Sequence, residues 1–165
     1  MSVKPVVGIL MGSDSDLFIM EEASKILKKF KIPYEMTISS AHRTPKRTSQ
    51  YAKTAEKRGI KIIIAGAGSA AHLAGFVAAE TTLPVIGVPI DSSPLKGFDA
   101  LFSTVQMPGG VPVACMAIGL AGAKNAAIFA AEMLAISDTR LRRSLHEYRK
   151  ELAKQVAEKA KKLNL

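Results

Sequence analysis

The sequence has a single cysteine and no long apolar run, and these two absences exclude several classes of protein. Cys115 lies alone within an apolar stretch, so neither a disulfide framework nor a cysteine-based metal site can form. No run approaches the roughly 18 apolar residues that a membrane-spanning helix needs, and the first residues carry no leader pattern. We therefore expect an unprocessed cytoplasmic protein in a reducing compartment, with no membrane partner.

Three common catalytic motifs are also missing. The chain lacks the G-x-x-x-x-G-K-[ST] phosphate loop, the G-x-S-x-G elbow of serine hydrolases and the H-E-x-x-H pair of zinc enzymes. ATP hydrolysis, serine-hydrolase chemistry and zinc catalysis therefore lose their main support.

The composition that is present is typical of one globular domain. The chain has 165 residues, of which 48% are hydrophobic and 22% are charged, far from the composition of disordered chains. No internal repeat, low-complexity tract or Gly/Ser-rich linker divides it. We predict a single catalytic domain over residues 1–165.

The net charge of +9 is concentrated at the C-terminal end. Residues 140–165 hold nine basic and three acidic residues, which accounts for +6 of the total. Apolar residues in the same segment recur at spacings of three, four or seven, which predicts a docking helix over 138–165 with a solvated basic face. Contact with nucleic acid is the alternative, but no binding motif or aromatic platform accompanies the charge, and we expect no nucleic-acid partner. The predicted apolar stripe consists of Leu141, Leu145, Tyr148, Leu152, Val156 and Leu163.

Strand-like and helix-like segments alternate along the chain with short connections. This order predicts an α/β three-layer sandwich with a mostly parallel, flavodoxin-like or Rossmann-like sheet. The stretch 89–110 is predicted to be an irregular, functional loop, and the Ala-rich helix is apolar nearly all round and should be buried. The predicted strands span residues 5–11, 34–39, 61–65, 83–88 and 111–118. The predicted helices span residues 17–30, 45–58, 70–81, 123–135 and 140–165, with Thr44 as the N-cap of the second.

The loop after the first strand consists of small polar residues, Gly12-Ser13-Asp14-Ser15-Asp16. Ligands in such sheets collect beyond the carboxyl ends of the strands, and free N–H groups at a helix start favour an anion. Simple N-capping by serine and aspartate is the alternative, although capping requires fewer such residues. We predict phosphate or ribose binding here.

The loop after the second strand carries the most informative pair, His42 and Arg43. An imidazole beside a strand end can exchange protons near neutral pH, and a guanidinium can hold phosphate or carboxylate through two parallel hydrogen bonds. A lone loop histidine is often only a surface residue, but its neighbours favour acid/base chemistry on an anionic substrate.

The loop after the third strand, 66–72, fits the relaxed dinucleotide pattern G-x-G-x-x-A, and Asp91 follows the next strand. A dinucleotide site is therefore an alternative. However, the motif follows the third strand instead of the first, and short Gly-rich turns occur wherever a backbone approaches a ligand. His72 could line the pocket or cap the turn, and His146, on the basic helix, is predicted to be solvated.

Taken as whole strings, five ordered segments closely resemble one family, class I N5-carboxyaminoimidazole ribonucleotide mutase of purine biosynthesis. The resemblance extends to Leu134 and omits only the C-terminal helix. The segments are GSDSDLFIM (12–20), SAHRTP (40–45), AGAGSAAHLAG (65–75), LPVIGVP (83–89) and QMPGGVPVACMAIG (106–119).

The resemblance implies an isomerisation that moves a carboxylate from the exocyclic nitrogen of aminoimidazole ribonucleotide to ring carbon C4, without ATP, metal or other cofactor. His42 would be the general acid/base. It also implies a homo-octamer with sites built between subunits. The implied substrate-binding residues are Gly12, Ser13, Asp16, Ser40 and Arg43 for the nucleotide, and Gly68, Ser69, Ala70, His72 and Leu73 for the base and CO₂.

The chain departs from the family pattern at four positions. The family usually has glycine at Ser69, proline at Ala74, methionine at Phe76 and threonine at Cys115. None of these changes removes a proton-transfer or phosphate-binding group, and Ser69 is the one that can alter the pocket. A binding module without catalysis is the remaining alternative, and it would lose no chemistry when His42 is replaced.

Overall fold

The computed structural model describes residues 4–163 and divides into two compact units, with the boundary after Ala130. The first unit contains the sheet and most of the helices, and the second contains the end of one helix and the C-terminal helix. The prediction of one catalytic domain with a docking helix over 138–165 stays a prediction.

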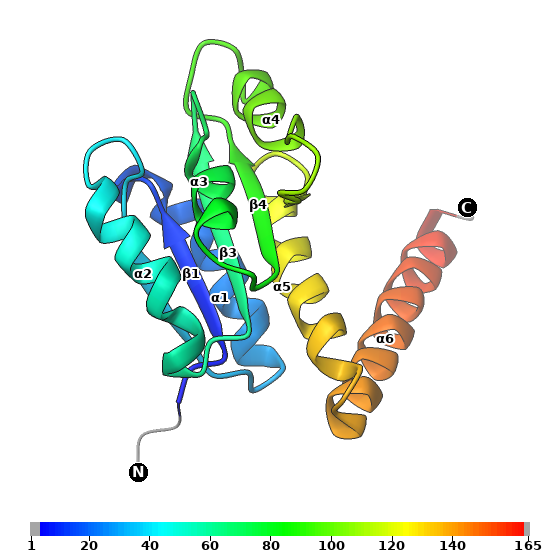
Figure 1. Ribbon diagram of the computed structural model, residues 1–165. Helices are drawn as coiled ribbons and strands as arrows, with labels where there is room; N and C mark the ends of the chain where they lie inside the picture. The colour runs from blue at the N-terminus through cyan, green and yellow to red at the C-terminus, as the bar shows by residue number, and fades with distance from the viewer. Residues whose placement is uncertain (1–3, 164–165) are drawn as a thin grey trace. The chain divides into compact units, whose positions relative to one another are not determined.

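The first unit is built on a parallel five-stranded sheet in the order β2-β1-β3-β4-β5 (Figure 1). All pairings are parallel, with Val7 opposite both Tyr34 and Ile62. This is the flavodoxin-like order, so the predicted fold class is confirmed. The strands are β1 (Val7–Met11), β2 (Tyr34–Ile38), β3 (Ile62–Gly68), β4 (Val85–Ile90) and β5 (Ala114–Cys115).

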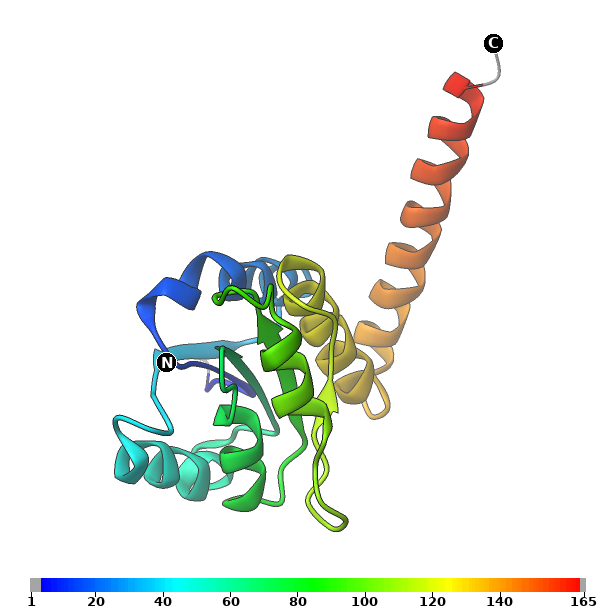
Figure 2. The same cartoon turned by 90° about the horizontal axis from the view of Figure 1, so that it is seen from above.

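Helices cover both faces of this sheet, as Figures 1 and 2 show together. One face carries α1 (Leu17–Lys29) and the first part of α5 (Leu120–Ala135), which an ion pair of 3.2 Å between Lys124 and Glu22 joins. The other face carries α2 (Pro45–Arg58), α3 (Leu73–Ala79) and α4 (Phe98–Val105). Because both faces are covered, the central strands are apolar throughout, and every residue of β1 and β4 is buried.

The start and end signals of α2 illustrate how the sequence sets these elements. Pro45 occupies the first helical position, and Gly59 ends the helix in the left-handed conformation at φ 99°. Thr44 occupies the predicted N-cap position, but its side chain makes no capping hydrogen bond to the helix. The Thr44 hydroxyl donates to the carbonyl of Ser40 and accepts from the Ser40 N–H, so it closes the preceding loop instead of capping the helix.

Four predicted boundaries need correction. Strand β3 continues through Gly68, where Ala67 pairs with Pro89, so the glycines assigned to a loop extend the sheet. Helix α3 begins at Leu73, later than predicted, and β5 is only two residues long. The stretch predicted to be irregular contains α4, whose small Ala100 and Thr104 face the core and whose larger apolar residues face outward.

The second unit contains α6 (Thr139–Leu163), which follows the end of α5. The Asp138 carboxylate accepts hydrogen bonds from the N–H groups of Arg140 and Leu141 and so caps α6. Leu141 and Leu145 are buried, but the rest of the predicted stripe is more exposed, and Val156 is 67% exposed. Within residues 4–163, no helix combines the length and the apolar character that crossing a membrane requires.

The C-terminus of α1 gives a first testable prediction. Lys31 has φ 57° in a Schellman motif, in which the Ile32 N–H donates to the Leu27 carbonyl and the Lys31 N–H to the Lys28 carbonyl. A side chain in this left-handed conformation is strained, so Lys31→Gly should stabilise the fold by about 1 kcal/mol in urea unfolding. Lys28→Gly, inside the helix and with the same loss of charge, should destabilise it by about 1 kcal/mol. Equal effects of the two variants on the free energy of unfolding would contradict the strained, left-handed conformation of Lys31.

Candidate active site

A pocket of about 320 Å³ lies where β1, β2 and β3 end. In this strand order β2 lies on one side of β1, and the chain then crosses to place β3 on the other side. Ligands bind at the carboxyl ends of the strands at such a switch point. All eleven residues predicted for the site line this one pocket. They are Gly12, Ser13, Asp16, Ser40, His42, Arg43, Gly68, Ser69, Ala70, His72 and Leu73.

The loop after β1 forms a short 3₁₀ turn, Asp14–Asp16, in which capping and pocket lining coincide. The Asp16 carboxylate is buried and accepts a hydrogen bond of 3.0 Å from the Ser13 N–H. Burial raises the pKa of Asp16, whereas the hydrogen bond from the Ser13 hydroxyl lowers the pKa of Asp14. The N-capping that was the alternative for this loop is therefore present, with Ser13 and Asp16 as the capping residues. The same two residues also line the pocket.

The loop after β2 is tied to the loop after β1 by Arg43. Its Nη2 donates to the Gly12 carbonyl at 2.7 Å, and its backbone N–H donates to the Ser40 hydroxyl at 3.2 Å. Below the loop, the buried hydroxyls of Ser39 and Thr48 are hydrogen-bonded at 2.8 Å and anchor it to α2. The guanidinium therefore lies at the pocket wall with a defined direction and with donors left for an anion.

His42 and His72 are in direct contact. Nε2 of His42 lies 2.9 Å from Nδ1 of His72, and the rings meet edge to face with centroids 5.0 Å apart. One of the two nitrogens must carry the proton and the other must accept it, so the bond forms only while at least one ring is neutral. The sequence placed both histidines near the pocket but did not predict their contact.

At the end of β3 the backbone of Gly68 packs closely against the side chain of Ser92. Ser92, in the loop after β4, lies so close to Gly68 that a β-carbon at residue 68 would clash with its hydroxyl. Ser92 also lines the pocket and was not predicted, although the rule that parallel strands end at one edge could have found it. A side chain at position 68 would therefore have to displace Ser92.

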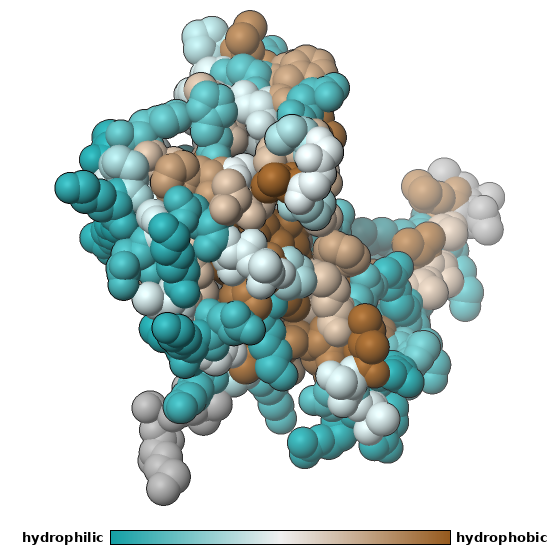
Figure 3. Space-filling model, in the orientation of Figure 1, coloured by the Kyte–Doolittle hydropathy of each residue, from teal (hydrophilic) through white to brown (hydrophobic). Residues whose placement is uncertain are grey.

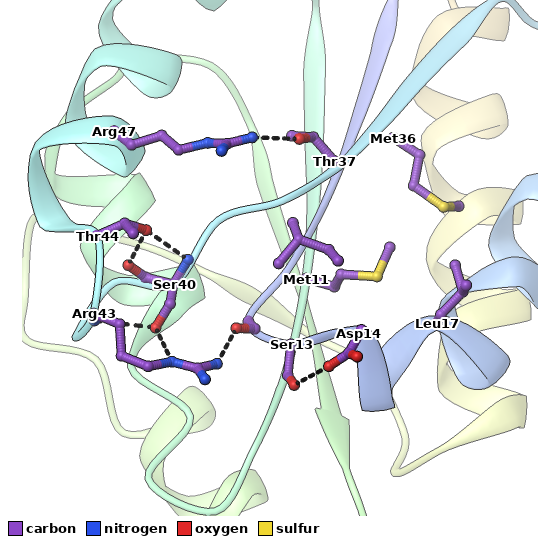
Figure 4. Close-up of a pocket in the computed structure, with 12 residues that line it drawn as sticks. Met11, Ser13, Asp14, Leu17, Met36, Thr37, Ser40, Arg43, Thr44 and Arg47 are labelled. Atoms are coloured by element: carbon purple, nitrogen blue, oxygen red, sulfur yellow. Dashed lines mark hydrogen bonds between the residues drawn. The ribbon is translucent and has the colours of Figure 1, made fainter.

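A larger and more open pocket of about 870 Å³ adjoins the first and shares Gly12, Ser13, Ser40 and Arg43 with it (Figure 4). Its other walls include Leu17, the β2 edge strand and Arg47, whose Nη2 donates to the Thr37 hydroxyl at 3.1 Å. Arg47 was not predicted. Its position four residues after Arg43, at the start of a helix that follows a ligand loop, was the available signal.

The family model described as AIR carboxylase matches residues 6–155. The chain belongs to the AIR carboxylase family. The resemblance inferred from the sequence motifs is thereby confirmed, and the dinucleotide alternative for residues 66–72 is removed, since these glycines extend a strand of this family's fold.

Relatives within the family are similar over nearly the whole chain. N5-carboxyaminoimidazole ribonucleotide mutase of Pyrococcus horikoshii is 57% identical over 98% of this chain and 90% of its own length. The mutase of Bacillus subtilis is 54% identical over 98% and 99%. Phosphoribosylaminoimidazole carboxylase of Schizosaccharomyces pombe is 55% identical over 96% of this chain, which spans 28% of that protein.

A solved structure of the family has the same fold. The crystal structure of Treponema denticola PurE superposes with a TM-score of 0.88 at 33% identity, covering 98% of this chain and 99% of that one. A likeness that spans both chains so fully means that the two chains share one overall fold.

Proposed function

We propose that this chain converts N5-carboxyaminoimidazole ribonucleotide to 4-carboxy-5-aminoimidazole ribonucleotide in purine biosynthesis. The observation that carries the proposal is the 57% identity to a protein named as this mutase over 98% of the chain. The site supports it, because one pocket combines a histidine pair, an arginine and a glycine-rich strand end.

In the proposed reaction His42 gives a proton and later recovers one. The bond between the exocyclic nitrogen and the carboxylate carbon breaks, CO₂ is released, and His42 protonates the nitrogen. C4 of the ring then attacks CO₂, and the proton that C4 carries returns to His42, so the reaction has no net proton change. Holding CO₂ beside C4 raises its effective concentration and limits its escape.

The remaining residues bind and enclose the nucleotide. Arg43 and the Ser13 loop receive the phosphate and ribose, and Ser40 holds Arg43 in place through its hydroxyl. Gly68 to Leu73 enclose the base and the CO₂ between the strand end and α3. His72 keeps the ring of His42 at the pocket through their hydrogen bond of 2.9 Å. No cofactor or metal takes part in the proposed steps.

We further propose that the active form is a homo-oligomer, an octamer as the resemblance implies, located in the cytoplasm. Exposed apolar side chains support a contact between copies, because monomers rarely leave such surface open. Figure 3 shows apolar surface around α4, where Phe98 and Phe102 are each 59% exposed and stack on one another. In the second unit Leu152, Val156 and Leu163 are also exposed, which suits a docking helix.

The proposal is tested by incubating the purified protein with N5-carboxyaminoimidazole ribonucleotide, without ATP or bicarbonate, and following the C4-carboxylated isomer. We expect conversion that does not depend on added ATP or bicarbonate. If nothing forms, aminoimidazole ribonucleotide and CO₂ are supplied instead. Turnover only under the second condition would contradict the mutase and indicate a direct carboxylase, and binding without turnover in either would indicate a binding module.

A further inference from the structure

Ser69 has a backbone conformation that residues with a side chain rarely adopt. Its φ is 53°, in the left-handed region, at the bend between the end of β3 and the start of α3. A β-carbon in this conformation crowds the following carbonyl group, which strains the backbone of a residue with a side chain. Lys31 and Lys96 share this conformation but do not line the pocket, so what sets Ser69 apart is its position at the pocket wall.

The Ser69 side chain is exposed at the wall of the 320 Å³ pocket. Within residues 4–163 its hydroxyl has no hydrogen-bond partner, whereas two other hydroxyls of the pocket are engaged. The Ser13 hydroxyl donates to Asp14, and the Ser40 hydroxyl accepts from Arg43. Ser92 likewise lines the pocket with no hydrogen-bond partner among the described residues, so Ser69 offers the pocket one of its uncommitted donors.

The surroundings of Ser69 favour a negative group. The guanidinium of Arg43 lines the same pocket and supplies positive charge that attracts an anion. The carboxylate of Asp16 belongs to the same pocket, but it already accepts the Ser13 N–H at 3.0 Å. Three residues after Ser69, His72 is hydrogen-bonded to His42.

We propose that Ser69 is a specificity residue whose hydroxyl donates a hydrogen bond to the carboxylate that the nucleotide carries. The inference rests on the proposed function and names which part of the substrate this residue recognises. The carboxylate is present in both substrate and product but not in the decarboxylated ring, so the hydrogen bond distinguishes carboxylated from non-carboxylated nucleotides. Because the bond is made in the ground state, it lowers KM and does not raise kcat.

The test compares dissociation constants of two nucleotides, 4-carboxy-5-aminoimidazole ribonucleotide and 5-aminoimidazole ribonucleotide, for the wild type, Ser69→Ala and Ser69→Gly. Both variants should bind the carboxylated nucleotide about tenfold more weakly, as expected for one hydrogen bond to a charged group, and the other nucleotide unchanged. Ser69→Gly should also melt at a higher temperature than Ser69→Ala, because only glycine relieves the strain. Ser144→Ala, an exposed serine on α6, is the matched control.

Equal weakening of both nucleotides would overturn the proposal, since it would assign Ser69 a purely structural role. Unchanged affinity for the carboxylated nucleotide in both variants would overturn it as well. If the wild type bound neither nucleotide, the proposed function would fail first, and the inference with it. A rise in KM with an unchanged kcat in the variants would support the ground-state role.

Discussion

Replacing His42 with asparagine is expected to lower the rate of carboxylate transfer by at least about a hundredfold, because the proposed general acid/base is lost. Asparagine keeps a polar side chain of similar size and leaves the loop bonds of Arg43 intact, since these involve Ser40 and Gly12. The measurement is kcat for N5-carboxyaminoimidazole ribonucleotide, together with the dissociation constant of the product. We expect binding to change much less than kcat.

The chain contains its own control for this experiment. It has three histidines, and His146 is exposed on α6 in the second unit, so His146→Asn should retain full activity. The His42 variant leaves His72 in place at the pocket wall. Wild-type turnover by His42→Asn would remove His42 as the acid/base and leave His72 as the pocket's remaining imidazole.

Most of the fold was predictable because local signals and burial agree. The apolar run 5–11 has no polar alternation, which is typical of a strand covered on both faces, and every residue of β1 is buried. Pro45 and Gly59 set the limits of α2 correctly. Helix α4 was missed because prolines and glycines surround it, and because its large apolar residues face outward, so the segment lacks the pattern of a packed helix.

The site was predictable to a different degree. The rule that parallel strands end at one edge was sufficient to bring three separate loops together, and all of their predicted residues line one pocket. What the sequence could not supply was which side chains touch. The pairing of His42 with His72, thirty positions apart, depends on how β2 and β3 align with β1. The position of Ser92 beside Gly68 depends on the register of β3 and β4.

Arg43 is the residue for which position and charge are hardest to separate. Its guanidinium donates to the Gly12 carbonyl and so joins the loops after β1 and β2, and it also supplies positive charge to both pockets. Of these two pockets, Arg47, one helical turn along, lines the larger and not the smaller, and it donates to Thr37 on the edge strand. Comparing variants of the two arginines therefore separates the effect of positive charge on the nucleotide from the effect of the hydrogen bond that joins the two loops.

Arg43→Ala should raise KM for the nucleotide by about ten- to a hundredfold, because a charge-assisted hydrogen bond to the phosphate is lost. Arg43→Lys should recover only part of this loss, since an ammonium group cannot reach the phosphate and Gly12 together in the planar geometry of a guanidinium. Arg47→Ala should have a smaller effect on KM measured under the same conditions. If Arg47→Ala instead causes the larger loss, the phosphate lies in the larger pocket beside the β2 edge, and the role of Arg43 is to hold the two loops together.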